Sequence, residues 1–341
     1  MIWAEAEGCR VVDTDGRSYL DLSGGFGVAA LGHRNPDVGA AIAAQAERCV
    51  HALGDLAEAD VTVELRQRLG GAGRAVMLGV TGEDAVEIAL RTALLVTGRH
   101  GIVAFEGAYH GVGLAALAPT DFQHFREPFA FWLPGPVYRY PYGEDPGPLP
   151  SDAGCVIVEP VQGRGGARVP PDGFLETLRE RCDETGALLI ADEIYTGLGR
   201  TGVMWRSGTL ADLVTCGKAL GGGLPLSACL MSPEHARAWE LGPEAVYTHT
   251  HMGSPLACAA ALSVLERVPQ LLERVHQAGE RFAADGWHGA GLIRAKDGDA
   301  QRALDRGVIV VPAGEDGRLM SATPPLTITD DEIDEALERL A

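Results

Sequence analysis

The chain has 341 residues, of which 46% are hydrophobic, and its formal net charge at pH 7 is -19. A chain of this length can bury one large core and still supply a smaller second domain. The strongly negative charge argues against nucleic acids and anionic membranes as partners, because both are themselves negatively charged.

Location and redox state follow from local composition. The first residues lack the basic start and apolar stretch of a signal peptide. No apolar run approaches the roughly 20 residues that cross a bilayer. The seven cysteines are scattered, odd in number and without CxxC spacing, which favours reduced thiols buried in a core. We therefore expect a cytoplasmic protein with no membrane partner and no metal site.

Seven short apolar runs are typical of strands buried in a mainly parallel sheet, which are continuous rather than alternating in pattern. Helical patterns lie between some of them, as in 83–96 and 173–186, and the second ends at Gly186. This alternation predicts an α/β fold with functional loops at the carboxyl edge of the sheet. The predicted strands are 75–80, 101–105, 155–159, 187–192, 212–216, 226–231 and 307–312.

The chain also suggests a division into two parts. Segment 127–151 is rich in Pro, Gly and aromatic residues and is expected to be a long surface excursion. From residue 255 onward the patterns are mainly helical. We expect a large domain, 36–249, and a small α+β domain built from both chain ends, 1–35 and 250–341.

Lys218 is one of only two lysines, the other being Lys296. It follows the apolar run 212–216 and precedes LGGGLP, a turn in which backbone can approach a ligand closely. A lysine forms a Schiff base only where its amine can be neutral. On this motif alone, a surface lysine at the end of a strand is an equally good interpretation.

Residues Thr81, Gly82 and Glu83 follow the run 75–80 and open a predicted helix. Free backbone N–H groups and the helix dipole there favour a bound phosphate. A plain helix cap, with Thr81 at the N-cap and Asp84 at N3, is the alternative, and both can hold together. Neither GxGxxG after a strand nor GxxxxGK[ST] occurs, so a dinucleotide or nucleoside triphosphate is not favoured.

Two further predicted strands end in side chains suited to a flat cationic ring. Asp192 closes the run 187–192, where a buried carboxylate needs a cation such as a protonated pyridine nitrogen or Arg200. Ile194 lies two residues further on and can pack on a ring face. Tyr109, after the run 101–105, can stack on an aromatic cofactor or simply cover the core.

Five motifs then occur in the order of a known family. They resemble those of the class III (subgroup II) pyridoxal-phosphate-dependent aminotransferases of fold type I, the group of ornithine, acetylornithine and 4-aminobutyrate aminotransferases. The resemblance covers nearly the whole chain. It implies a large domain with a mainly parallel central sheet, a smaller α+β domain, and amine and carbonyl substrates. The motifs are TGEDAVEIALR, GAYHG, VEPVQGRGG, LLIADEIYTGLGRTG and CGKALGGGLPLSA.

The resemblance also implies roles. Lys218 would form the internal aldimine with pyridoxal 5'-phosphate and move the proton during catalysis, and Asp192 would hold the pyridinium nitrogen. THTHMGSP resembles the segment whose threonine, Thr250 here, reaches the phosphate of the neighbouring subunit. This implies a homodimer with its active site at the interface. The remaining cofactor-binding residues would be Thr81, Gly82, Glu83, Tyr109, Glu159, Ile194 and Tyr195.

Tyr195 is one of three departures from the family pattern. The family usually has Gln at this position, hydrogen-bonded to the phenolic oxygen of the cofactor. The Tyr195 hydroxyl can donate to the same oxygen, or the ring can merely fill the space.

The other two departures concern substrate. Ser321 stands where related enzymes carry an arginine that binds carboxylate, and Arg164 stands where they often carry its glutamate partner. Losing both members of the pair leaves no orphan charge. Arg164 or Arg318 can replace the carboxylate clamp, or each can be an ordinary exposed arginine. We expect ω-amino acids, diamines or amino sugars as substrates, with 2-oxoglutarate a poor acceptor.

Three functions remain open on the sequence. The first is an aminotransferase that moves an amino group between an amine or ω-amino acid and a keto acid or aldehyde. The second is an aminomutase or amino-acid racemase on the same scaffold. The third is a non-catalytic protein that binds the cofactor, against which Lys218 and Asp192 argue, because binding alone needs no electron sink.

Overall fold

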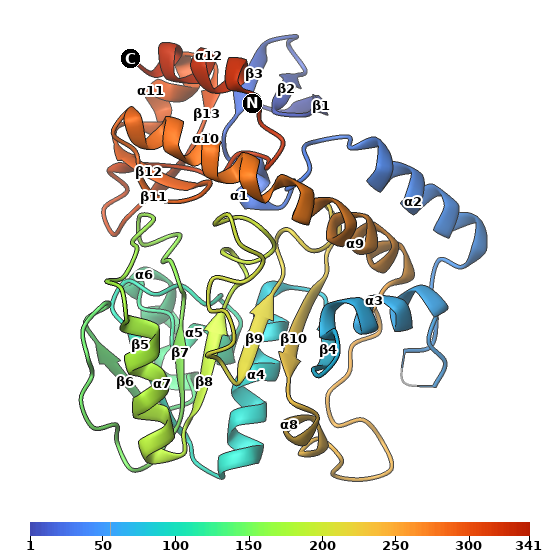
Figure 1. Cartoon of the computed structure of the whole chain (residues 1–341), viewed down its shortest axis with the longest axis vertical. Coiled ribbons are helices and arrows are strands. Elements are labelled where there is room, and N and C mark those ends of the chain that lie inside the picture. Colours follow the sequence, from blue (N-terminus) through green and yellow to red (C-terminus); the bar gives the residue numbers. More distant parts are fainter. Residues whose placement is uncertain (55) are drawn as a thin grey trace.

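The computed structural model describes residues 1–54 and 56–341. Its centre is a seven-stranded sheet in the order β4-β10-β9-β8-β7-β5-β6, which occupies the lower half of Figure 1. Strands β6, β5, β7, β8 and β9 are parallel, whereas β10 runs antiparallel to both of its neighbours. The mainly parallel sheet that the sequence predicted is thus confirmed.

Six of the seven predicted strands belong to this sheet. They are β4 (Ala75–Gly79), β5 (Gly101–Phe105), β7 (Ala153–Val158), β8 (Leu188–Asp192), β9 (Leu213–Cys216) and β10 (Ser227–Met231). Their runs are continuous in apolar residues because helices cover both faces of the sheet. On β5, Ile102 and Ala104 join the cluster beneath helix α4 (Gly82–Thr97), and Val103 and Phe105 join the one beneath α7 (Phe174–Thr185).

The seventh strand, β6 (Val137–Tyr140), was missed. It lies in the segment expected to be a surface excursion, yet it pairs in parallel with β5, from Ile102↔Val137 to Phe105↔Tyr140. The aromatic and β-branched run VYRY favours a strand, and its partly exposed position at the sheet edge explains the absence of a continuous apolar run. The same segment also contains the short helix η1 (Glu127–Trp132).

Two smaller sheets lie above the central one in Figure 1. One has the order β1-β2-β3-β13 and joins the two chain ends, because β3 pairs in parallel with β13. The other has the order β11-β12-β15-β14. Their strands are β1 (Trp3–Glu7), β2 (Arg10–Asp13), β3 (Ser18–Asp21), β11 (His288–Ala290), β12 (Ile293–Asp297), β13 (Val308–Ile309), β14 (Val311–Ala313) and β15 (Leu319–Ala322).

The prediction of a single strand over 307–312 was wrong in its extent. The run is divided at Val310, since Val308 and Ile309 pair with β3 while Val311 to Ala313 pair with β15. Periodicity cannot reveal such a division, because both halves are apolar. The run therefore connects the two small sheets.

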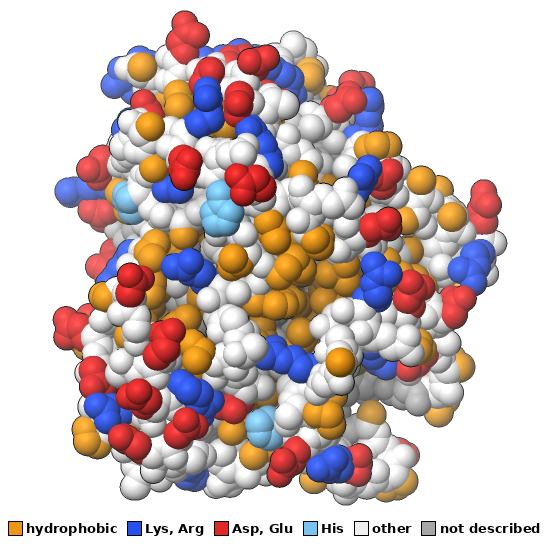
Figure 2. Space-filling view, in the orientation of Figure 1, with side chains coloured by type: hydrophobic (Ala, Val, Ile, Leu, Met, Phe, Trp, Pro, Cys, Tyr) orange, Lys and Arg blue, Asp and Glu red, His pale blue; other side chains and the backbone are white. Residues whose placement is uncertain are grey.

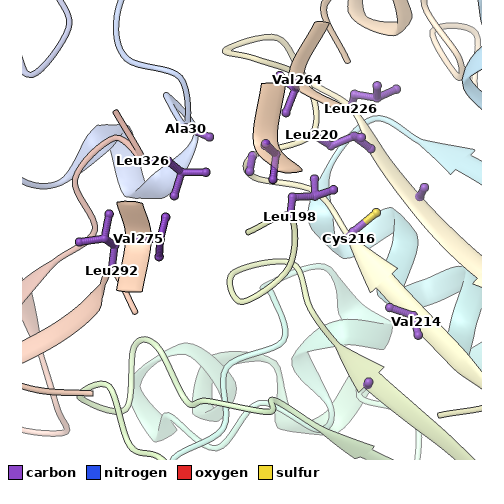
Figure 3. Close-up of a cluster of buried hydrophobic side chains, with 14 of the residues drawn as sticks. Ala30, Leu198, Val214, Cys216, Leu220, Leu226, Val264, Val275, Leu292 and Leu326 are labelled. Carbon is purple, nitrogen blue, oxygen red and sulfur yellow. The ribbon is translucent and has the colours of Figure 1, made fainter. Parts of the chain in front are cut away.

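Helices surround these sheets and share one large hydrophobic cluster. In Figure 3, side chains from the chain ends, such as Ala30, Val275, Leu292 and Leu326, face others from the larger part, such as Leu198, Leu220 and Leu226. The proposed boundaries near residues 36 and 249 stay a prediction. The remaining helices are α1 (Gly24–Gly27), α2 (Pro36–Arg48), α3 (Asp60–Gly70), α5 (Leu114–Leu117), α6 (Gln123–Arg126), α8 (Pro233–Arg237), α9 (Pro255–Arg267), η2 (Val268–Leu271), α10 (Leu272–Ala284), α11 (Ala300–Asp305) and α12 (Asp330–Leu340).

One helical segment, Pro255–Ala284, is long and apolar enough to cross a membrane by length and composition alone. No apolar run of this length was expected from the sequence, and the structure differs because α9, η2 and α10 follow one another without a break. Half of its most apolar stretch is buried inside the protein, and α9 packs against α2 and α3. Burial of this kind is what a core helix shows.

Candidate active site

A cavity of about 600 Å³ lies beside the carboxyl ends of the central strands. Hydrophobic side chains gather across the middle of the face seen in Figure 2, between the two halves of the molecule. Loops after β4, β5, β7, β8 and β9 each supply residues to the cavity, because parallel strands end at one edge of their sheet. The predicted site residues that line it are Thr81, Gly82, Glu83, Tyr109, Glu159, Arg164, Asp192, Ile194, Tyr195 and Lys218.

Asp192 is the last residue of β8, and its carboxylate is buried. Its Oδ2 lies 2.7 Å from His110 Nδ1, and its Oδ1 accepts a hydrogen bond of 3.2 Å from the hydroxyl of Thr215. Thr215 is its cross-strand neighbour on β9. Arg200, the alternative partner, instead donates to the carbonyls of Pro324 and Gly27. The carboxylate is therefore rigidly oriented, and it has no arginine partner among residues 1–54 and 56–341.

Lys218 follows β9 and is partly buried. Burial lowers the pKa of its amine, although the nearby carboxylates of Asp192 and Glu159 act in the opposite direction. The amine nitrogen lies 4.7 Å from the centroid of the Tyr195 ring. A lowered pKa makes the neutral, nucleophilic amine more accessible, which Schiff-base chemistry requires.

Tyr109 and Glu159 are joined across the ends of β5 and β7. The backbone N–H of Tyr109 donates to Glu159 Oε1 at 2.8 Å, and that of Gly163 donates to Oε2 at 3.2 Å. Burial nevertheless raises the pKa of Glu159 to about 7. Glu159 thus holds the backbone at Tyr109, whose ring lines the cavity.

The N-terminus of α4 has the predicted capping box, in which Thr81 Oγ1 accepts from Asp84 N and Asp84 accepts from Thr81 N. The Glu83 carboxylate accepts from the backbone of Val112 and Gly113, at 3.2 and 2.7 Å. Its side chain is therefore occupied with protein donors. The first backbone N–H groups of a helix have no intrahelical partners and suit an anion such as phosphate.

Ile194 lies between two glycine segments of the site. A Cβ at Gly82 or at Gly217 would come within 3.0 Å of the Ile194 side chain. Because these two positions have no side chain, Ile194 can pack between the N-terminus of α4 and the backbone just before Lys218. This fixes the apolar wall that Ile194 gives to the cavity.

Tyr195 packs directly on backbone. A Cβ at Gly163 would lie 2.2 Å from the ring, so only glycine fits there. The hydroxyl donates to Thr323 Oγ1 at 3.3 Å, and Thr323 in turn donates to the carbonyl of Ser23 at 2.9 Å. Within the described chain, the hydroxyl is therefore directed toward residues from both chain ends.

The two arginines proposed for substrate differ in position. Arg164 lines the cavity, as does Ser321, which is buried on β15. Arg318 does not line it. The Arg318 side chain is 83% exposed and forms a 3.0 Å ion pair with Asp316. The geometry therefore favours Arg164 over Arg318.

Thr250 is exposed and does not line the cavity of its own chain. This position fits a residue that acts on another subunit, and its role stays a prediction.

Sequence reasoning missed several residues of the site. His110 is buried and holds Asp192, and its place directly after Tyr109 in GAYHG was the available signal. Phe26 and Val28, near the N-terminus, and Val311 to Ala313, near the C-terminus, also line the cavity. These have no local signal, because only the tertiary fold brings both chain ends to the sheet.

These groups suit one cofactor. A buried carboxylate without an arginine partner in the described chain, an amine with a lowered pKa, an aromatic and an aliphatic side chain in one cavity, and a helix N-terminus fit pyridoxal phosphate. The fold and the site thus define an enzyme that depends on pyridoxal phosphate.

Comparison with known proteins gives the family. The model of the aminotransferase class III family matches residues 1–285. The acetylornithine aminotransferase of Methanopyrus kandleri is 38% identical over 98% of this chain and 92% of the relative. The 4-aminobutyrate aminotransferase of Escherichia coli is 33% identical over 98% of this chain and 91% of the relative. The chain belongs to the class III aminotransferases, and its cofactor is pyridoxal 5'-phosphate.

Solved structures agree. The ornithine aminotransferase of Toxoplasma gondii has a TM-score of 0.90 at 27% identity, covering 99% of this chain and 89% of that one. An amine transaminase from an uncultivated Pseudomonas species, solved in its PLP-bound form, has a TM-score of 0.86 at 30% identity. That match covers 100% of this chain and 93% of the other. The aminotransferase activity and fold type predicted from the sequence are thereby confirmed.

Proposed function

We propose that Lys218 and Asp192 are the catalytic residues of this aminotransferase, with Lys218 as the attachment point of the cofactor. The observation that carries the proposal is their joint presence in one cavity, where Asp192 is held by His110 and Thr215 and burial lowers the pKa of Lys218. Asp192 would hold the ring nitrogen protonated, and the cofactor, when bound, supplies an electron sink.

The other residues bind and orient. The backbone N–H groups of Gly82 and Glu83 and the hydroxyl of Thr81 would bind the phosphate, since the Thr81 N–H already donates to Asp84. Tyr109 and Ile194 would contact the ring faces. Lys218, once released from the cofactor, is the group that can take a proton from the amine-bearing carbon of the substrate. The neutral form that burial favours is the form able to accept that proton.

Glu159 and Tyr195 belong to the frame around these groups. Glu159 fixes the Tyr109 backbone, and Tyr195 provides a ring face beside the Lys218 amine.

We further propose a homodimer in which Thr250 completes the phosphate site of the neighbouring subunit. Its support is the exposed position of Thr250 outside its own cavity. Large apolar side chains are exposed as well, among them Phe131 at 97% and Trp132 at 69%. Exposed apolar groups of this size are typical of surfaces that bind another protein. A cytoplasmic location and the division at residues 36 and 249 belong to the same proposal.

As amino donors we propose amines and ω-amino acids, because Ser321 cannot hold a carboxylate as an arginine would. A half-reaction screen tests this. The cofactor-loaded enzyme should lose its yellow colour when an amine donor is added without an acceptor. An aminomutase or racemase would interconvert isomers of the amine donor and show no net loss of the yellow colour.

A separate experiment tests which lysine holds the cofactor. Borohydride reduction followed by peptide mapping should place the cofactor on Lys218 and leave Lys296 free, since Lys296 pairs with Asp285 at 2.8 Å outside the cavity. An adduct on Lys296, or protein that stays colourless with added cofactor, contradicts the proposal.

A further inference from the structure

Arg164 is held against three aromatic rings beside the cavity. Its guanidinium carbon lies 5.1 Å from the ring centroid of Tyr109, 5.5 Å from that of Phe122 and 5.0 Å from that of Phe125. A guanidinium that stacks on aromatic faces keeps its N–H groups free at the edge, in a fork that matches a carboxylate. The rings thus restrain the cation without neutralising it.

The backbone beneath this side chain is also fixed. The Arg164 carbonyl accepts a hydrogen bond of 3.0 Å from Gly314 N, directly after β14, and Gly163 N donates to Glu159. The side chain therefore begins from a point tied to both the central sheet and a small sheet. A preorganised arginine loses less conformational entropy when it binds an anion.

The acidic groups of the cavity are already occupied. Glu83 accepts from two backbone N–H groups, Glu159 accepts from two others, and Asp192 is bound by His110 and Thr215. Arg164, in contrast, forms no ion pair with any carboxylate in residues 1–54 and 56–341. Among the described residues that line the cavity, it is the arginine that remains available to a ligand.

Most of the cavity wall is apolar. Phe26, Val28, Leu224 and Val311 line the cavity, and Ser321 adds a neutral hydroxyl. A second carboxylate on a ligand would face this apolar surface, and a buried charge without a partner is costly. The wall therefore suits a ligand with one carboxylate.

We propose that Arg164 binds the substrate carboxylate, and that the amino acceptor is a monocarboxylic 2-oxo acid with a small or apolar remainder. This inference rests on the proposed function and deepens it by naming the substrate class. It also places the carboxylate of an ω-amino acid donor on the same arginine. Dicarboxylic acids such as 2-oxoglutarate would leave one charge unpaired.

The first test measures binding without turnover. Pentanoate, which has a carboxylate and no amine, is titrated into the cofactor-loaded enzyme by calorimetry. We expect Arg164→Gln to weaken its affinity by roughly tenfold or more, and Arg164→Lys to recover part of the loss. Equal affinity in the wild type and in Arg164→Gln would overturn the proposal.

Arg168→Gln is the matched control. Arg168 lies on the same loop, is exposed as Arg164 is, and stacks on the Tyr142 ring at 5.3 Å, but it does not line the cavity. Its replacement should leave pentanoate affinity within about twofold, as is usual for surface substitutions. A loss equal to that of Arg164→Gln would show a general effect of charge, and it would overturn the specific assignment.

The second test measures specificity. With an amine that has no carboxylate as donor, kcat/KM for pyruvate should exceed kcat/KM for 2-oxoglutarate by roughly tenfold or more in the wild type. Arg164→Gln should reduce this value for pyruvate mainly through KM, because the arginine binds ground state and transition state alike. Equal use of both acids would contradict the inference. If no amine reacts at all, the proposed function fails, while the pentanoate titration still reports on Arg164.

Discussion

His110 Nδ1 and Asp192 Oδ2 lie 2.7 Å apart, and both side chains are buried. A carboxylate can only accept, so the histidine donates from this nitrogen. Thr215 donates to the other carboxylate oxygen at 3.2 Å. The carboxylate is thus oriented from two sides, and no arginine from the described part of the chain pairs with it.

We expect Asp192→Asn to reduce turnover while the protein stays folded. A neutral amide cannot keep the ring nitrogen protonated. We expect a loss of roughly 100-fold or more in rate, which corresponds to about 2.7 kcal/mol or more of activation free energy. The measurement is kcat per mole of bound cofactor, with thermal unfolding to check the fold.

Asp212→Asn serves as its control. Asp212 pairs with Arg179 at 2.6 Å and accepts from Leu189 N, away from the cavity. This substitution should affect stability more than turnover. Unchanged activity per folded molecule of Asp192→Asn would show that Asp192 is structural.

Glu159→Gln should change how stability depends on pH. Burial raises the pKa of Glu159 from 4.5 to about 7, so between these values the folded protein binds a proton that the unfolded chain lacks. The free energy of unfolding then falls as pH rises through this window. Glutamine removes the titration, and the variant should lose less stability from pH 5 to 7.

The experiment uses urea unfolding of cofactor-free protein at several pH values. Comparing the variant with the wild type cancels the contributions of other carboxylates. Identical slopes in the two proteins would mean that Glu159 does not titrate in this range.

Thr250→Ala should weaken retention of the cofactor without changing the mass of the assembly. Thr250 is exposed and lies outside its own cavity. Loss of one hydroxyl contact to a charged group costs about 1.5–3 kcal/mol, or roughly tenfold or more in cofactor affinity. Light scattering and equilibrium dialysis measure the two properties. A monomer with full activity would refute the shared site.

Tyr195→Phe distinguishes the two roles considered for this residue. The hydroxyl donates to Thr323 Oγ1, while the ring packs on Gly163 and faces the Lys218 amine. We therefore expect a stability loss of about 1 kcal/mol and an unchanged pH midpoint for the visible band of the bound cofactor. Tyr195→Leu, which removes the ring, should shift that midpoint. A shift in Tyr195→Phe would show that the hydroxyl reaches the cofactor.

Local sequence patterns were sufficient to place a site residue wherever that residue lies at or just after the end of a strand of the central sheet. Asp192 and Lys218 could be placed together because parallel strands end at the same edge, and the apolar runs before them were continuous. The same reasoning placed Thr81 at the start of α4. The order of the strands was not accessible, and neither was the reversed direction of β10.

The residues that were missed depend on contacts between distant segments. Phe26 lines the cavity because Arg200 and Thr323 hold the N-terminal turn, through the carbonyls of Gly27 and Ser23. No periodicity in residues 20–30 signals such contacts. Arg318 could not be separated from Arg164 either, because only the fold shows that Arg318 pairs with Asp316 in solvent.

The pairing of β3 with β13 has a consequence for the order in which the enzyme is assembled. Leu20 has no parallel partner strand until Val308 has been synthesised. Thr323 N must also reach the carbonyl of Leu22. Contacts this distant in sequence form late, because long loops must close first. On the ribosome, the central sheet with Lys218 is therefore complete before the N-terminal turn with Phe26 closes the cavity. A chain that stops short of residue 308 leaves the buried side chains of Leu20 and Leu22 exposed, and it should be a substrate for proteolysis.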